Sequence, residues 1–217
     1  MRALIFDTET SNLPERNASI YEHKKWPHIL QLSFILYDTV NLKALTIHDY
    51  IIKIPDDVDI SEESIKIHGI TRSRCKRKGV PITIALEEFQ DYLDKADIVI
   101  GHNVDFDKKM IMVETLRNKM VNKFVSYGVP KAEHCTMKNN IGLCNIIREN
   151  KKGEKYFKFP TLTELYFHLF NEMPKNMHNS MADVLICLRC YMIIQFRIDI
   201  LKARDNVLKN IYKQQCT

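Results

Sequence analysis

Two acidic residues stand two positions apart at the end of the first apolar segment. Residues 2–7 form a nearly continuous apolar run that ends in Asp7, and Glu9 follows in the order Phe-Asp-Thr-Glu-Thr. Such a run is typical of a central strand buried on both faces, and residues two apart on a strand point to the same face. Two neighbouring carboxylates repel each other more strongly as water leaves, and a cation bound between them removes that conflict. Taken alone, the pair is better explained as two ordinary acids at a solvated strand end.

Two further segments add acids at the starts of helices. Residues 97–101 read as a second buried strand, and His-Asn-Val-Asp-Phe-Asp follows, with Asp107 in the first turn of the next helix. Acids are common there because they complement the helix dipole. His178 and Asp183 stand five positions apart at the start of the last apolar helix. An Asp in such a helix needs a partner, because burying an unpaired charge is unfavourable.

In this order the three segments resemble the exonuclease motifs of the DEDDh branch of the DnaQ-like nucleases. The motifs are Asp-x-Glu, His-Asn-x-x-Phe-Asp and His-x-x-x-x-Asp, and the resemblance covers roughly residues 2–195. Three motifs in order are far more specific than any one of them. Two positions depart from the family pattern: Asn12 lies in a turn where relatives carry Gly, and Ser180 replaces a common Ala. Four connecting segments are also family-like, at residues 26–32, 67–71, 135–137 and 157–165.

The resemblance implies a role for each matching residue. Asp7 would bridge two Mg²⁺ or Mn²⁺ ions, while Glu9 and Asp183 would complete the coordination of the ion that binds the attacking water. Asp107 would serve the second ion, partly through water, and His178 would be the general base. Ligand sets made only of oxygen favour Mg²⁺ or Mn²⁺ over zinc, and two such ions suit an in-line displacement at phosphorus.

The resemblance also implies contacts with the last nucleotide of a strand. His102 and Asn103 would shape the pocket for that nucleotide, and Leu13 would wedge against its base. Thr8 and Thr10 complete the expected substrate-binding set. The implied partners are therefore the 3′ ends of DNA or RNA.

We expect 3′→5′ hydrolysis of single-stranded DNA to nucleoside 5′-monophosphates, by a free-standing or a proofreading enzyme. An exoribonuclease with the same site stays open, because no motif reports on contacts with the 2′-hydroxyl group. The third hypothesis is a non-catalytic, polymerase-associated module that binds nucleic acid. Retention of all five predicted catalytic residues argues against it.

The elements that position these residues follow from apolar periodicity. Strands are predicted at residues 2–7, 29–37, 45–54 and 97–101. Helices are predicted at residues 61–68, 82–95, 106–120, 161–170 and 180–195. This order predicts an α/β fold with a mixed β-sheet flanked by helices, and the resemblance implies that the fold is ribonuclease-H-like.

Three polar segments have no assigned role. The segment Arg72–Lys78 holds five cations and is expected to be an exposed loop, either solvated or gripping phosphates. A second exposed loop is expected at residues 148–158. The exonuclease-like domain is expected to span residues 1–196, and residues 197–217 a charged extension of the last helix or a tail. That segment either lengthens the helix or binds a partner such as a DNA polymerase.

Composition narrows the class of protein. With 217 residues, 45% apolar and 27% charged, the chain can form one folded domain with a small appendage. The net charge of +5 permits a phosphate-rich partner without requiring one. The sequence does not indicate an oligomeric state.

Cysteine usage and hydropathy indicate the compartment. The six cysteines are too scattered for a disulfide scaffold, and Cys187 and Cys190 are expected to be thiols of the core. The first apolar run is too short for a signal peptide, and charges interrupt residues 184–201, so no membrane segment is expected. We expect a cytoplasmic protein in a reducing compartment, with the nucleus open as an alternative.

Overall fold

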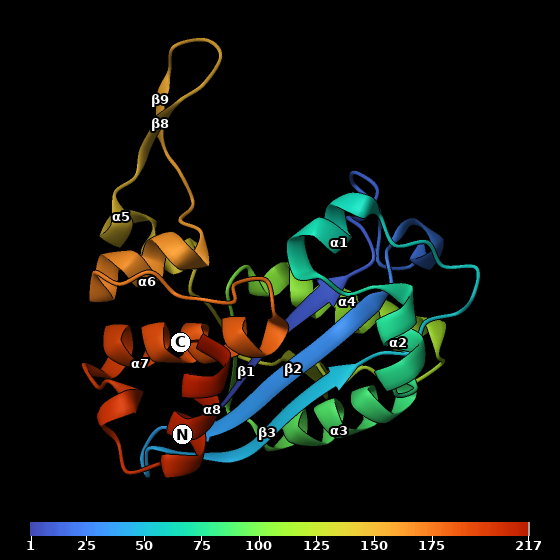
Figure 1. Cartoon of the computed structure of the whole chain (residues 1–217), viewed down its shortest axis with the longest axis horizontal. Coiled ribbons are helices and arrows are strands. Elements are labelled where there is room, and N and C mark those ends of the chain that lie inside the picture. The colour runs from blue at the N-terminus through green and yellow to red at the C-terminus, as the bar shows by residue number, and fades with distance from the viewer. Residues whose placement is uncertain (217) are drawn as a thin grey trace.

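The central strand of the molecule is β1 (Arg2–Thr10), the middle of a five-stranded sheet. The computed structural model, which describes residues 1–216, orders this sheet β3-β2-β1-β4-β7 (Figure 1). Strand β2 runs antiparallel to both β1 and β3, whereas β4 runs parallel to both β1 and β7, so the sheet is mixed as predicted. The other four strands are β2 (Ile29–Asp38), β3 (Lys43–Ile51), β4 (Ile98–Gly101) and β7 (Glu133–Cys135).

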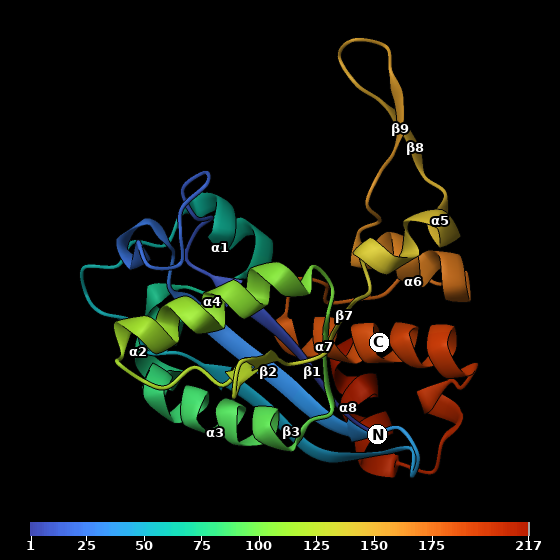
Figure 2. The same ribbon diagram turned by 180° about the vertical axis from the view of Figure 1, so that it is seen from behind.

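Helices cover both faces of the sheet, which explains the unbroken apolar run in β1. Figure 2 shows α3 (Ile82–Lys95) and α4 (Val104–Arg117) in front of the strands, and Leu4 and Phe6 pack with them. Ala3 and Ile5 point to the opposite face. That face is covered by α6 (Leu162–Phe170), α7 (Ser180–Phe196) and α8 (Asn206–Cys216).

Helix boundaries agree with capping signals in the sequence. Helix α1 (Glu62–His68) begins after Ser61, whose side chain accepts a hydrogen bond from the Ser64 backbone, and it ends at Gly69 in a left-handed conformation. Helix α6 begins with the predicted capping box, in which Thr161 and Glu164 bond each other's backbone. The short elements are η1 (His23–Lys25), β5 (Val125–Ser126), β6 (Val129–Pro130), η2 (Lys138–Asn140), α5 (Ile141–Cys144) and η3 (Ile200–Lys202).

The two segments expected to be loops are both ordered elements. Arg72–Lys78 is helix α2, whose N-cap is Thr71 and whose Cys75 is buried against Leu30 and Ile70. Residues 148–158 fall mainly in a β-hairpin of β8 (Ile147–Glu149) and β9 (Lys155–Phe157). Both predictions were wrong because the high charge of each segment masked its weak apolar pattern.

The C-terminal segment folds back on the domain. Helix α7 ends at Phe196, and Arg197 adopts a left-handed conformation, so the segment does not lengthen the helix. Helix α8 then buries Leu208 and Tyr212 in the core cluster beneath α7, whereas Thr217 lies outside the described residues.

All six cysteines are free thiols, and the predicted burial of Cys187 and Cys190 is confirmed. Among residues 1–216, no helix has the length and apolar character needed to cross a membrane.

Candidate active site

Three carboxylates converge between β1 and the first turn of α7. Asp7 and Glu9 lie on the face of β1 that α7 covers, and one carboxylate oxygen each from Asp7, Glu9 and Asp183 lie within 4.8 Å of one another. Ser180 holds the first turn of α7 against β1, since its hydroxyl donates to the Asp7 carbonyl oxygen at 2.6 Å. The side chain of Asn179 caps α7 by accepting from the Ala182 backbone. We call Asp7, Glu9 and Asp183, together with Asp107, the acid cluster.

Asp107 approaches β1 from the opposite side, on the first turn of α4. The backbone N–H and the hydroxyl of Thr8 both donate to Asp107 Oδ1, at 3.0 and 2.7 Å. Thr8 lies between Asp7 and Glu9 on the strand, so these bonds hold Asp107 beside both acids. Asp107 is only 3% exposed. It can therefore contact β1 and a ligand bound at the acid cluster, but hardly any solvent.

The acid cluster is electrostatically strained. Burial raises the pKa of Asp7 well above its usual range, and the charges of Asp107, Asp183 and Glu9 raise it further. Burial, followed by repulsion from Asp183 and Asp107, raises the pKa of Glu9 to about 8. Burial raises the pKa of Asp107 and of Asp183 to about 7, with repulsion from Asp107 adding at Asp183. Near neutral pH, the four acids are therefore not all ionised without a cation.

The chemistry of the donor atoms fits a hard divalent cation. Asp7 Oδ2 and Asp183 Oδ1 are buried, and neither accepts a hydrogen bond from any described residue. Buried carboxylate oxygens are rarely left unpaired, since the loss of hydration is unfavourable. Ligands that are all carboxylate oxygens suit Mg²⁺ or Mn²⁺. The residues present thus offer a site for such an ion.

His178 lies at the edge of the acid cluster. Its backbone N–H donates to Asp183 Oδ2 at 3.2 Å, while its φ of 64° places it in the left-handed region. The side chain is exposed, and no described residue hydrogen-bonds its ring. The backbone of His178 therefore contacts Asp183, and its imidazole is accessible from solvent.

A pocket of about 230 Å³ adjoins the acids, and several predicted substrate contacts line it. Leu13 is 76% exposed there, as expected of a residue that could contact a base. The Thr10 hydroxyl donates to the Asn12 carbonyl oxygen at 2.7 Å and shapes the turn that carries Leu13. The residues lining the pocket are Thr8, Glu9, Thr10, Asn12, Leu13, Ser61, Glu63, Ser64, Ile67, His68 and Phe106.

His102, which is predicted to shape the nucleotide pocket, is bonded by the protein at both ring nitrogens. Its Nδ1 bonds the Thr136 hydroxyl and its Nε2 bonds the Pro160 carbonyl oxygen, both at 3.0 Å, so neither ring nitrogen is free for a ligand. Burial lowers the pKa of His102 to about 4, and the ring is neutral. It ties the segment before α6 to the end of β4 and does not line the pocket beside the acids.

Asn103, predicted to shape the same pocket, also has a backbone role. It begins α4 with a φ of 72°, a conformation that asparagine tolerates better than most residues. The Asn103 carbonyl oxygen accepts from the Phe106 backbone at 2.9 Å. This turn sets the direction of α4 and so the position of Asp107.

His68 is a pocket residue that the sequence analysis did not select. Its Nε2 donates to the Thr10 carbonyl oxygen at 3.2 Å, and its Nδ1 accepts from the Ile70 backbone at 3.0 Å. It therefore connects the end of α1 to the end of β1. The available signal was its place in the family-like segment at residues 67–71, directly before the helix-ending Gly69.

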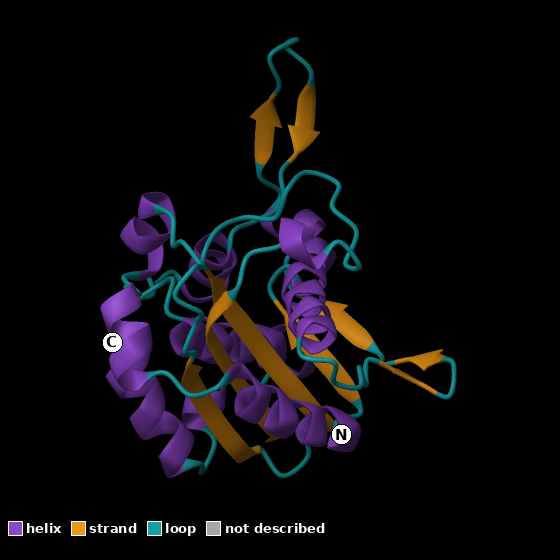
Figure 3. Ribbon diagram, turned by 90° about the vertical axis from the view of Figure 1, so that its right-hand side faces the viewer, coloured by secondary structure: helices purple, strands orange, loops and turns teal. Residues whose placement is uncertain are grey.

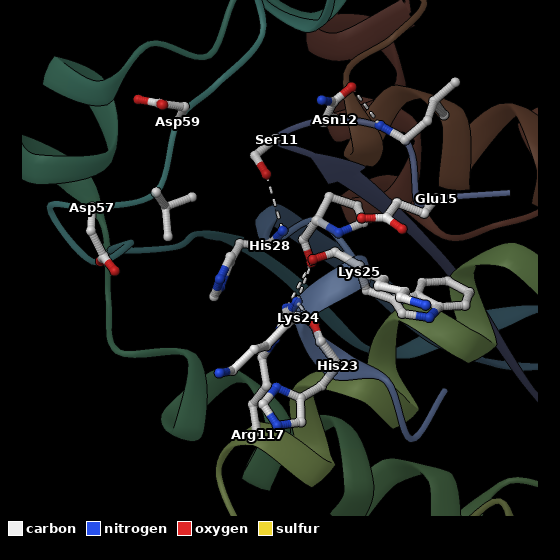
Figure 4. Close-up of a pocket in the computed structure, with 14 residues that line it drawn as sticks. Ser11, Asn12, Glu15, His23, Lys24, Lys25, His28, Asp57, Asp59 and Arg117 are labelled. Carbon is white, nitrogen blue, oxygen red and sulfur yellow. Dashed lines mark hydrogen bonds between the residues drawn. The ribbon is translucent and has the colours of Figure 1, made fainter. Parts of the chain in front are cut away.

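A second hollow, of about 650 Å³, lies behind the turn that carries Leu13 (Figure 4). Asn12 and Leu13 line both hollows, and His28 donates its backbone N–H to the Ser11 hydroxyl at 3.0 Å. Arg117 bonds the Pro27 carbonyl oxygen at 2.7 Å and so fixes the segment before β2. The hollow mixes acidic and basic side chains, and its hydrogen bonds hold the turn in place.

Comparison with known proteins decides the family. The model for RNase_T exonucleases matches residues 4–191, which include the acid cluster and His178. The chain belongs to the RNase_T exonuclease family. This finding confirms the predicted resemblance to DnaQ-like exonucleases. No curated protein matches the sequence.

Solved structures of exonuclease I share the fold of this exonuclease-family chain. The E. coli enzyme in complex with a dT13 oligonucleotide matches with a TM-score of 0.67 and 18% identity, over 90% of this chain and 41% of that chain. The zinc-bound E. coli complex with single-stranded DNA matches with a TM-score of 0.63 and 17% identity, over 98% and 42%. An apo form of exonuclease I gives 0.63 and 18%, over 96% and 43%. The chain spans about two fifths of the length of these structures, and the likeness confirms the ribonuclease-H-like fold.

Proposed function

We propose that this chain is a metal-dependent 3′→5′ exonuclease that hydrolyses single-stranded DNA to nucleoside 5′-monophosphates. One observation carries the proposal: Asp7, Glu9 and Asp183 converge within 4.8 Å and leave buried oxygens unpaired, in a chain of an exonuclease family. A strained group of acids is unfavourable unless it binds a cation.

The residues present would hold two Mg²⁺ or Mn²⁺ ions. Asp7, Glu9 and Asp183 would hold one ion, and Asp107 would hold the second together with Asp7. When bound, a pair of such ions supplies an acidified water and stabilises charge on the attacking and leaving oxygens.

The remaining chemistry belongs to the chain's own side chains. His178 would accept the proton of the attacking water, because its backbone bonds Asp183 at the edge of the acid cluster and its ring is exposed to solvent. Thr8 and Ser180 position Asp107 and Asp7 through the hydrogen bonds described above. Leu13 would pack against the terminal base in the pocket beside Glu9. These roles place the 3′ end of a strand at the acid cluster.

The choice of DNA follows from the structural neighbours. Exonuclease I of E. coli has been solved with dT13 and with dA16 oligonucleotides, which makes single-stranded DNA the first substrate to test here. Neither the pocket residues nor the motifs identify a contact with a 2′-hydroxyl group.

A substrate comparison tests this proposal. Single-stranded DNA and RNA of the same sequence, labelled at the 5′ end, are incubated with the protein in Mg²⁺, in Mn²⁺ and in excess EDTA. We expect a descending ladder from DNA with either metal, slower degradation of a strand with a 3′-phosphate, and no reaction in EDTA. Faster degradation of RNA would make the enzyme an exoribonuclease. Early release of the 5′ label as a mononucleotide would contradict the direction.

A further inference from the structure

The β8–β9 hairpin projects from the body of the molecule beyond α5 and α6 (Figures 1 and 3). We call residues 146–159 the arm. Its strands pair Ile147 with Phe157, Arg148 with Tyr156 and Glu149 with Lys155, and all six of these residues are exposed. An isolated two-stranded hairpin is only marginally stable in water, so an exposed arm of this kind is poorly explained as a support for the core.

The arm carries four cations without partners. Arg148, Lys151, Lys152 and Lys155 are exposed and form no ion pair with any other residue of the 1–216 range. The arm's two acids are Glu149 and Glu154, and Glu154 accepts a hydrogen bond from the Asn150 side chain at 2.7 Å. The arm therefore has an excess of positive charge that nothing described in the protein neutralises.

The same segment exposes large apolar side chains. Tyr156, Phe157 and Phe159 are 50%, 56% and 48% exposed. Tyr156 lies directly across from Arg148, so an aromatic ring and a guanidinium group share one face of the hairpin. Phe157 lies on the other face, across from Ile147. Aromatic rings interleaved with cations are the composition of surfaces that bind single-stranded nucleic acid, where bases stack and phosphates pair.

The root of the arm, at residues 158–160, is held beside the start of α4, the helix that carries Asp107. Lys158 pairs with both carboxylate oxygens of Glu164, at 2.7 and 2.8 Å, and His102 bonds the Pro160 carbonyl oxygen. His102 precedes Asp107 by five residues, which span at most about 18 Å when fully extended and less here because α4 begins between them. A strand whose 3′ end lies at the acids thus reaches the arm within a few nucleotides.

We propose that the arm binds the single strand on the 5′ side of the terminal nucleotide, stacking bases on Tyr156, Phe157 and Phe159 and pairing phosphates with its four cations. This assignment rests on the proposed function for the position of the 3′ end. A protein partner could cover the apolar residues, but the unpaired cations favour a polyanion.

Two arm variants and two matched controls test the proposal. The first variant combines Tyr156→Ala with Phe157→Ala, and its control is Tyr127→Ala, a fully exposed tyrosine at the β5–β6 turn. The second combines Lys151→Gln, Lys152→Gln and Lys155→Gln. Its control makes the same charge change at exposed cations far along the chain from the arm, with Lys43→Gln, Lys202→Gln and Arg204→Gln.

Binding of a fluorescent single strand of about 20 nucleotides is measured in EDTA, and hydrolysis of that strand and of a dinucleotide is measured in Mn²⁺. The aromatic variant should bind the long strand at least about 10-fold more weakly. The lysine variant should lower the slope of log affinity against log salt by about 2, at about 0.7 per lost contact. Both variants should hydrolyse the dinucleotide as the wild type does, and both controls should be unchanged.

Two results would overturn the role of the arm. One is unchanged binding of the long strand by both variants, which would leave a protein partner as the better explanation. The other is an equal loss on the dinucleotide, which would place the defect in the acid cluster. If the wild type cleaves neither substrate, the proposed function fails, while the binding measurements in EDTA still decide the role of the arm.

Discussion

The Oδ2 atom of Asp7 is buried away from water, and it accepts no hydrogen bond from any described residue. It faces three other carboxylates, and the Ser180 hydroxyl donates to its backbone carbonyl oxygen. Burial and like charge act in the same direction on this group, so we expect a bound cation to stabilise the folded chain. At the scale of single residues, the unsatisfied acids are the reason that we expect a metal to bind here.

The raised pKa values predict how stability changes with pH. A carboxyl group whose pKa is higher in the folded chain than its ordinary value of about 4 stabilises the fold below that value, and this contribution is lost as pH rises through the folded pKa. The pKa values of Glu9, Asp107 and Asp183 are raised to between about 7 and about 8. The melting temperature of the metal-free protein should therefore fall between pH 5 and pH 8. Thermal melts in EDTA measure this loss.

Metal should reverse the loss at pH 8 and have little effect at pH 5, where the ligands bind protons instead. Asp7→Asn should flatten the pH dependence, whereas Glu62→Gln, at an exposed position that begins α1, should preserve it. A melting temperature in EDTA that rises between pH 5 and pH 8 would contradict the strained cluster.

His178 and Asp183 should be separable by substitution. His178→Ala should lower the single-turnover rate by about 10²–10⁴-fold, the usual effect of losing a positioned base, while metal still raises the melting temperature. Asp183→Asn should lose rate and metal-induced stabilisation together, because its Oδ1 atom is one of the unpaired oxygens. If His178→Ala abolishes the metal shift, the histidine is a ligand.

The sequence was informative about these residues where the signal is local. Spacing on a strand indicated that Asp7 and Glu9 share a face, whereas their meeting with Asp183 was implied only by the resemblance to the exonuclease motifs. The partners of His102 and His68 could not be predicted, since each bonds a backbone carbonyl 58 residues away. Spacing within a motif does not report contacts at such separations.

At the scale of elements, helices α4 and α7 pack on opposite faces of β1. Helix α4 carries Asp107 and α7 carries Asp183. Helices with caps, such as α1 and α6, could be located from sequence because the residues that form a cap lie close together in the chain. Helix α2 and the arm could not, because Cys75 is the one buried residue of α2 and both strands of the arm are exposed. Apolar periodicity identifies an element only when the element buries a face.

His102→Leu tests how the arm is joined to the sheet. The substitution removes the hydrogen bond to the Pro160 carbonyl oxygen and one of the hydrogen bonds of the Thr136 hydroxyl, so it should reduce the free energy of unfolding by about 1–3 kcal/mol. Amide exchange in residues 146–160 should accelerate, and metal-induced stabilisation should persist. The control is His23→Leu, at an exposed position, with an expected change within about 0.5 kcal/mol. Unchanged amide exchange in residues 146–160 would show that other contacts hold the arm to the rest of the molecule.

At the scale of the whole molecule, a buried arginine joins α6, α7 and α8 to one another. Arg189 on α7 bonds both carboxylate oxygens of Asp199, at 3.0 and 2.9 Å, and contacts Tyr166 of α6 and Tyr212 of α8. Its guanidinium group also lies 3.9 Å from the ring centroid of Phe170. These contacts explain why α8 packs under α7 instead of continuing it.

Asp199→Ala should therefore destabilise the whole fold. Removing the carboxylate leaves Arg189, which is 7% exposed, with only the longer ion pair to Glu172 at 3.6 Å. Loss of one partner of a buried pair lowers the free energy of unfolding by about 3–5 kcal/mol. Urea denaturation measures the change, with Asp56→Ala at an exposed site as the control. The metal-induced shift in melting temperature should remain. A loss below about 1 kcal/mol would mean that the pair contributes little.

Single-turnover hydrolysis of a 5′-labelled single strand tests most directly whether the acid cluster is the hydrolytic centre. Wild type, Asp7→Asn and Asp105→Asn are compared in Mg²⁺ and in EDTA, because Asp105 lies on the same turn of α4 as Asp107 but pairs with Lys109 outside the cluster. We predict a metal-dependent descending ladder for the wild type and for Asp105→Asn. Asp7→Asn should be at least about 100-fold slower, since even residues that only support a metal ligand contribute 10–100-fold. Full hydrolysis in EDTA, or equal rates for Asp7→Asn and Asp105→Asn, would contradict the assignment.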